Sequence, residues 1–148
     1  MSSQIPIKHI DLRVFAHATE DTDKVLNAVR NILPADVANT VVFKKTNLAG
    51  HHGNPIILFE ARIKEKNAVK ALFEKLSSKL SPLDKEQLKS EINQHLDKGN
   101  LYIRLDKQSA YLNELKLCTA DPIHLKMHFK KSSREEIIKI CRDIGFLP

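Results

Sequence analysis

The residues whose types and spacing could do chemistry lie in one short stretch, Asn47 to Pro55. Two of the four glycines of the chain, Gly50 and Gly53, enclose the adjacent residues His51 and His52. Glycine adopts positive φ at no steric cost, so the backbone here can turn sharply and approach a ligand closely. The two imidazoles would then offer hydrogen-bond donors and flat rings to an RNA loop or a phosphate group.

Runs rich in β-forming residues flank this stretch, at residues 40–45 and 55–63. The arrangement predicts a β-hairpin whose loop lies at one end of a sheet and carries His51, His52 and Asn54. The alternative is a plain turn whose histidines face water.

The histidines do not predict a metal site. Adjacent residues of an extended chain point in opposite directions, so His51 and His52 would rarely bind one ion. His124 and His128 are better placed to share a face, but no cysteine or carboxylate stands at ligand spacing from them. The chain also lacks a nucleophile elbow, a phosphate-cradling glycine loop and a zinc-protease motif. We therefore expect no catalytic residues, no metal and no cofactor.

Length and composition indicate one domain, residues 1–148, with a core of its own, since 42% of the 148 residues are hydrophobic. The formal net charge is +6. Positive charge permits binding to phosphates without demonstrating it. The charge is spread along the whole chain, so no basic tail accounts for it.

Cysteine usage and hydropathy suggest a compartment. Cys118 and Cys141 lie far apart and lack metal-ligand spacing, so two free thiols in a reducing environment are favoured over a disulfide. No apolar run reaches the ~18 residues of a membrane span, and the N-terminus lacks the apolar core of a signal peptide. We expect an intracellular, cytoplasmic protein.

The hydrophobic pattern predicts an α+β fold, a two-layer sandwich with a mainly antiparallel sheet and helices mostly on one face. Helices are expected from a cap at Thr19 to Pro34, over residues 64–79, from Ser81 to about Asp97 with a stop at Gly99, and from the Ser133 capping box to Gly145. Besides the hairpin, strands are expected at 5–17 with a bulge near His9, at 101–105, at 123–129 and, as a short segment, at 115–117, with a turn or single helical turn at 106–111. The residues expected to be buried are Ile10, Leu12, Val14, Phe59, Ile103, Leu105, Leu125 and Met127.

The opposite face of these strands would be basic and partly aromatic. Its members would be Arg13, Phe15, His17, Lys44, Arg62, Tyr102, Arg104, His124, Lys126 and His128, with Asp11 and Glu60 as the acids. Cations with interleaved aromatic rings can hold phosphates and stack unpaired bases. The same pattern is also typical of the solvated face of an ordinary antiparallel sheet.

Four motifs carry a resemblance to a known family. They are Gly50-His51-His52-Gly53-Asn54-Pro55-Ile56, Leu101-Tyr102-Ile103-Arg104-Leu105-Asp106-Lys107-Gln108, Thr19-Glu20-Asp21-Thr22-Asp23-Lys24-Val25 and Asp121-Pro122-Ile123. Over residues 7–144 the chain resembles an archaeal family labelled as RNA-binding proteins or predicted exosome subunits. That family's fold is similar to the large-subunit ribosomal protein that holds 5S ribosomal RNA. The family has a glycine about two residues after Tyr111, where this chain has Asn113, a residue that also accepts the left-handed conformation.

The resemblance implies a non-enzymatic RNA-binding protein near RNA processing, the exosome or the ribosome. Together with the basic face, it suggests these RNA-binding residues: Lys44, Lys45, His51, His52, Asn54, Arg62, Tyr102, Arg104, Lys107, Gln108 and Lys126. We further expect the hairpin loop to meet Arg104, Lys107 and Gln108 in space. Two alternatives stay open: a protein-interaction subunit whose basic face meets an acidic partner, and a small hydrolase or metal protein with an unrecognised site.

Overall fold

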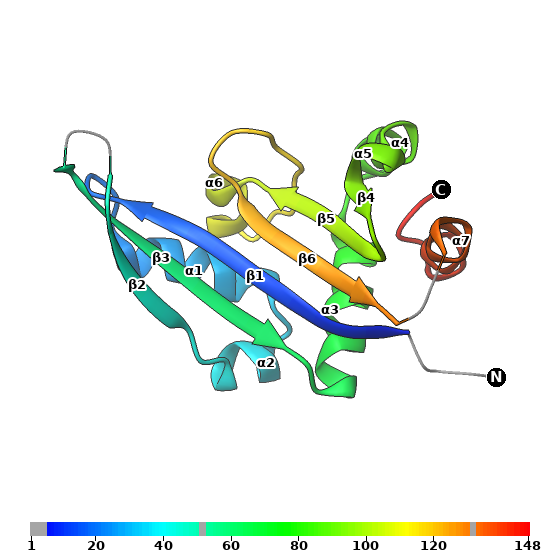
Figure 1. Ribbon diagram of the computed structural model, residues 1–148, viewed down its shortest axis with the longest axis horizontal. Coiled ribbons are helices and arrows are strands. Elements are labelled where there is room, and N and C mark those ends of the chain that lie inside the picture. Colours follow the sequence, from blue (N-terminus) through cyan, green and yellow to red (C-terminus); the bar gives the residue numbers. More distant parts are fainter. Residues whose placement is uncertain (1–5, 51–52, 131–132) are drawn as a thin grey trace.

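A single antiparallel sheet with helices on one face organises the chain (Figure 1). The computed structural model describes residues 6–50, 53–130 and 133–148. Within these ranges six strands lie in the order β2-β3-β1-β6-β5-β4, and every neighbouring pair is antiparallel. The predicted α+β, two-layer architecture is confirmed. No helix of the described ranges is long and apolar enough to cross a membrane.

The strands are β1 (Ile7–His17), β2 (Lys44–Ala49), β3 (Pro55–Ile63), β4 (Leu96–Asp97), β5 (Asn100–Leu105) and β6 (Ile123–Phe129). The helices are α1 (Thr22–Ile32), α2 (Ala35–Thr40), α3 (Lys66–Lys79), α4 (Pro82–Ser90), α5 (Ile92–His95), α6 (Lys107–Tyr111) and α7 (Arg134–Ile144). The helices α1, α2 and α3 lie behind the sheet in Figure 1, which leaves the front face open.

The core lies between the sheet and the helices because alternate strand residues point toward the helices. All eight residues expected to be buried are buried. Phe73 of α3 stacks on Phe146 with ring centroids 5.2 Å apart, and it meets the edge of Phe129 at 6.4 Å. The bulge expected near His9 is confirmed as a register shift between Ile7 and His9 in the pairing of β1 with β6.

Several local signals in the sequence act as predicted. Ser133 and Glu136 form a reciprocal capping box at the start of α7, and Gly145 ends that helix at φ 86°. Asn113 adopts φ 63°, so the left-handed conformation expected at this turn is present. Cys118 and Cys141 are free thiols, and burial raises the pKa of Cys141 to about 12.

Two expected boundaries in the first third of the chain are wrong. The cap of α1 is Asp21 and not Thr19, because the Asp21 carboxylate accepts the backbone N–H groups of Asp23 and Lys24. The short helix α2 follows Pro34 and ends at Thr40, the residue at which we expected a strand to begin. Strand β2 therefore starts at Lys44 and continues to Ala49, so the hairpin loop is shorter than expected.

The helix expected from Ser81 to Asp97 is also wrong in its second half. The Ser81 hydroxyl caps α4 as predicted, but α4 ends at Ser90, and the short α5 leads into β4. Leu96 pairs with Leu101, so Gly99 (φ 82°) turns the chain between two strands and does not end a helix. The short strand expected at 115–117 is a single bridge between Leu117 and Leu105.

The first testable consequence concerns the core. Leu105, at the end of β5, is 0% exposed, so Leu105→Ala should lower the free energy of unfolding by about 2–5 kcal/mol. Urea denaturation followed by circular dichroism measures the change. Leu83→Ala is the matched control, because Leu83 is 80% exposed and its truncation should cost less than about 0.5 kcal/mol. Equal effects of the two substitutions would contradict the packing described here.

Candidate nucleic-acid interface

Antiparallel register sets the open-face side chains in two lateral rows. Row one crosses five strands and consists of Lys44, Glu60, Arg13, His124 and Arg104, which are direct cross-strand partners in that order. Row two lies two residues along each strand and consists of Arg62, Asp11, Lys126 and Tyr102. Residues that pair directly across an antiparallel ladder place their side chains on the same face, so each row is a line of neighbouring side chains.

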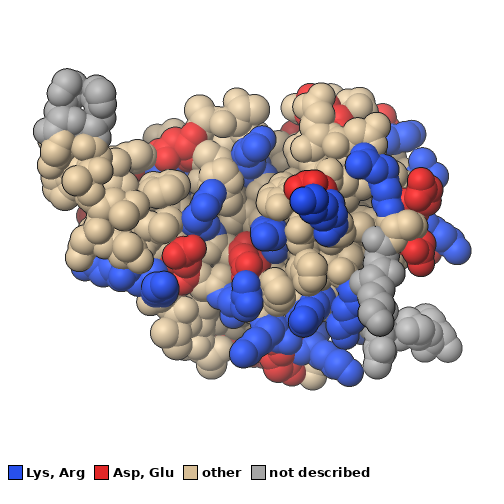
Figure 2. All heavy atoms as spheres, in the orientation of Figure 1, with Lys and Arg blue, Asp and Glu red and all other residues tan. Residues whose placement is uncertain are grey.

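The rows hold five Lys or Arg side chains and two carboxylates, so the open face is positive. Figure 2 shows Lys and Arg side chains over the middle of this face and toward one end, whereas the end with the β2–β3 hairpin carries few charges. A hollow of about 750 Å³ lies between the rows and is lined by both carboxylates, four of the cations, Tyr102 and His124. Val42, which is 83% exposed, forms part of its rim.

Row one contains the cations that are free to bind an anion. No carboxylate of the described residues lies within ion-pair distance of Lys44, Arg13 or Arg104. Arg13 lies over the ring of Phe15, with its guanidinium carbon 5.9 Å from the ring centre. This contact holds the arginine on the face without neutralising its charge.

His124 lies between Arg13 and Arg104, as the cross-strand partner of both. Partial burial lowers its pKa, and the two neighbouring guanidinium groups lower the pKa further. The imidazole is therefore neutral at neutral pH and becomes a cation only when the solution is acidified or a nearby anion offsets the arginines.

Row two is more fully occupied by internal contacts. Arg62 donates two hydrogen bonds to Asp11, from Nε at 2.7 Å and from an Nη at 3.0 Å. Lys126 lies over the ring of Tyr102, with its Nζ 6.0 Å from the ring centre. Next to this row, the rings of His9 and His128 stack with centroids 5.1 Å apart. Tyr102 in row two and the His9–His128 pair beside it thus offer flat ring surfaces, whereas row one offers unpaired cations.

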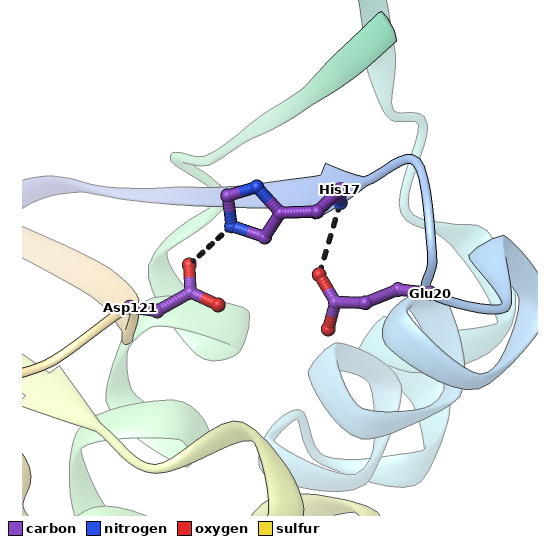
Figure 3. A group of neighbouring side chains, drawn as sticks. All are labelled: His17, Glu20 and Asp121. Carbon is purple, nitrogen blue, oxygen red and sulfur yellow. Dashed lines mark hydrogen bonds and ion pairs between the residues drawn. The ribbon is translucent and has the colours of Figure 1, made fainter. Parts of the chain in front are cut away.

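A separate polar cluster lies where β1 ends (Figure 3). Ligand-type atoms of His17, Glu20 and Asp121 lie within 4.8 Å of one another, which is a geometry that could hold a metal ion. The ammonium group of Lys107 already lies among them, 3.0 Å from Glu20 and 2.8 Å from Asp121. It also donates to the backbone carbonyl of Phe15 at 2.8 Å. The cluster is an internal ion-pair network in which the lysine takes the position of a cation.

Asp121 shows the strength of this network. Burial opposes ionisation, but hydrogen bonds from Lys107 and His17 lower the pKa of Asp121 below its usual range. Asp121 adopts φ 46°, a backbone conformation that non-glycine residues rarely take. Its ion pair with Lys107 and its hydrogen bond with His17 join the segment before β6 to the end of β1.

The sequence-predicted RNA-binding residues separate into groups. Lys44, Arg62, Tyr102, Arg104 and Lys126 share the open face. The remaining six do not. Lys45 pairs with the core residue Phe59 and so points to the helix side, and Asn54 lies at the hairpin loop. Lys107 belongs to the ion-pair network, Gln108 lies exposed on α6, and His51 and His52 are not among the described residues.

The hairpin loop does not meet Arg104. Row one places Arg104 level with Glu60, and Pro55 lies five residues from Glu60 along β3, roughly 17 Å away. Three strand spacings add to this distance across the sheet. Our expectation that Arg104 lies beside the hairpin loop is therefore wrong.

Arg13 was recognised on the basic face but not chosen as a binding residue. Arg13 is the cross-strand partner of Glu60, yet the two side chains form no ion pair. The sequence does not show that this arginine stays unpaired. The side chains of α4 and α5 near Arg104, among them Gln87 and Gln94, were missed altogether. We expected one continuous helix here, which would place these side chains away from the sheet. The sequence contains no signal for the break between α4 and α5 at Glu91.

The fold and this surface define an α+β domain with one open, basic sheet face, a class of surface suited to nucleic acid. A family model described as RNA binding matches residues 9–129, and the chain belongs to this family of RNA-binding proteins. The RNA-binding protein PAB1135 from Pyrococcus abyssi is 34% identical over 97% of this chain and 96% of its own length. The names of the family and of this relative indicate RNA binding and not an enzyme.

Solved structures share the fold. Protein AF2318 from Archaeglobus fulgidus superposes with a TM-score of 0.79 at 29% identity, over 93% of this chain and 99% of that one. Mth689, a DUF54 protein from Methanothermobacter thermautotrophicus, superposes with a TM-score of 0.78 at 27% identity, over 94% and 98%. The similarity to the 5S-binding ribosomal protein stays a prediction.

The ion-pair network makes Lys107 a structural residue in our interpretation. Lys107→Met should lower the free energy of unfolding by about 1–3 kcal/mol, because it leaves two carboxylates without their charged donor. Lys116→Met is the control, because Lys116 is largely exposed and its pair with Glu114 should contribute less than about 1 kcal/mol. Chemical denaturation of both variants measures the difference, and a Lys107 variant as stable as the control would refute the structural role.

The lowered pKa of His124 predicts a pH dependence of stability. The unfolded chain binds a proton on this imidazole near its ordinary pKa of about 6.5, where the folded chain does not, so stability falls as the pH drops below that value. Burial lowers the pKa of His9 and acts in the same direction. Denaturation curves from neutral to mildly acidic pH should show a shallower fall for His124→Gln than for the unmodified protein. Parallel curves for the two proteins would contradict this account of His124.

Proposed function

We propose that the open face of the sheet binds an unpaired segment of RNA, with phosphates along row one and a base against the ring of Tyr102 in row two. The observation that carries the proposal is the set of unpaired cations in row one, Lys44, Arg13 and Arg104. Membership of an RNA-binding family supports RNA as the anion.

The spacing of these cations suits a chain of phosphates better than one small anion. Arg13 and Arg104 are separated by two strand spacings, roughly 10 Å, and Lys44 lies equally far from Arg13 on the other side. A polyanion can contact all three groups at once, whereas an isolated phosphate contacts one. Like charges held apart in this way cost the folded protein stability that a bound phosphate chain would restore.

The ring of Tyr102 lies two residues from Arg104 along β5, so it is roughly 7 Å from row one. Tyr102, with Lys126 over its ring, offers a surface on which a base can stack. Stacking needs bases that are not paired in a duplex, so the arrangement favours a single-stranded or looped segment over double-stranded RNA. As a finer role, we propose an accessory, non-catalytic factor of cytoplasmic RNA processing, at the exosome or the ribosome, on the basis of the family resemblance.

Binding to a labelled single-stranded RNA, followed by fluorescence anisotropy over a series of salt concentrations, tests the proposal. Arg13→Ala with Arg104→Ala removes two phosphate contacts, so the log–log salt slope should decrease by about 1.4 and the affinity should fall. The matched control, Lys66→Ala with Lys79→Ala, removes the same charge from α3, which lies behind the sheet, and should change the slope much less.

Two outcomes would overturn the proposal. One is an affinity that does not change with salt. The other is an equal loss of affinity in the row-one variant and in the α3 control, since that would reduce binding to net charge. A further arm uses polyglutamate as competitor: if it displaces RNA at equal charge concentration, the face is a general acidic-partner surface and not an RNA site.

A further inference from the structure

A smaller hollow of about 150 Å³ lies beyond Arg104, where row one reaches the edge of the sheet. Its walls come from α4, from α5, from β5 and from the segment at residues 117–119. The polar side chains that line it are Gln87, Glu91, Gln94, His95, Arg104 and Thr119. We name it the edge pocket.

Hydrogen bonds hold the four walls together. The Asp84 carboxylate of α4 accepts the backbone N–H of Leu117 at 3.1 Å. The backbone N–H of Cys118 donates to the carbonyl of Arg104 at 3.1 Å. His95 of α5 donates from Nδ1 to the carbonyl of Tyr102 at 2.9 Å. The edge pocket therefore keeps its shape without a ligand, which lowers the entropy cost of binding one.

The lining has unused hydrogen-bonding capacity. Within the described part of the chain, the side-chain amides of Gln87 and Gln94 and the hydroxyl of Thr119 form no hydrogen bond. A glutamine amide presents a donor and an acceptor side by side, which is the pair needed to read the edge of a nucleobase.

Glu91 adds a preference among bases. Its carboxylate lies 3.6 Å from Nε2 of His95, which is too far for a good hydrogen bond. The carboxylate can therefore still accept a hydrogen bond from a ligand. Adenine, cytosine and guanine carry an exocyclic amine that donates to such a group. Uracil has no exocyclic amine, and its one edge donor, N3–H, lies between two carbonyl oxygens that the carboxylate would repel.

The size of the edge pocket limits the ligand. Pockets that hold drug-sized molecules start at roughly 300 Å³. A hollow of about 150 Å³ holds one ring system and leaves a sugar and phosphate outside, at the guanidinium of Arg104.

We propose that the edge pocket binds one unpaired, amine-bearing base of the RNA whose phosphates lie along row one. This inference rests on the proposed function and adds base selectivity to it. Arg104 belongs to both, because it ends row one and lines the edge pocket. The open face then supplies affinity that is independent of sequence, and the edge pocket discriminates between bases.

The test compares a labelled uracil oligomer with the same oligomer carrying one central adenine, each titrated by fluorescence anisotropy. The unmodified protein should bind the adenine oligomer about tenfold more tightly. Gln87→Ala with Gln94→Ala should reduce this ratio to near one, with the salt slope unchanged. Asn67→Ala, which truncates an exposed amide on α3, is the control and should keep the ratio.

The outcomes separate this inference from the proposed function. Salt-sensitive binding with an unchanged adenine preference in the double variant overturns the edge pocket alone. Binding that is absent or insensitive to salt in the unmodified protein overturns the proposed function. If the double variant melts at a lower temperature, Glu91→Gln decides instead: it keeps the shape of the side chain, and an unreduced adenine preference in it would overturn the inference.

Discussion

The register of β1 is the constraint on which the rest of the structure depends. This strand pairs with β3 on one side and with β6 on the other, so its alternation is imposed on both neighbours. Its even-numbered residues from Ile10 to Ala16 are buried, and its odd-numbered residues face the open side. A slip of one residue would place Arg13 in the core and Val14 in water. The basic face therefore follows from the same register that forms the core.

The molecule uses its charges in two distinct ways. Around Lys107, opposite charges lie within 3.1 Å and join the end of β1 to the start of β6. Along row one, cations lie on the same sheet without carboxylates near enough to pair. The motif from Leu101 to Gln108 contains one residue of each kind, Lys107 and Arg104, and the sequence alone does not show which of them is already neutralised. Side-chain exposure separates them, since Lys107 is 11% exposed whereas Arg104 is exposed.

Sequence reasoning succeeded where the signal was periodic and local. Alternation in β5 and β6 predicted the buried face, and the change of phase near His9 predicted the bulge. It failed where tertiary pairing overrides helical propensity. Leu96 and Asp97 continue a helical pattern, yet they pair with β5, and that pairing brings α4 and α5 beside Arg104. The edge pocket could not be predicted, because its walls come from three segments that only the folded chain brings together.

Row one places the like charges of Arg13 and Arg104 on either side of His124, and the protonation state of His124 decides how strong their repulsion is. Two arginines flank this imidazole on neighbouring strands, an arrangement of like charges that a protonated histidine would worsen. The lowered pKa keeps His124 neutral, so the protein tolerates unpaired arginines on a folded sheet at neutral pH. A phosphate between Arg13 and Arg104 would reverse the balance and favour protonation of His124. Binding of a polyanion to this face should therefore take up a proton, which links affinity to pH through the same residue that lowers stability in acid.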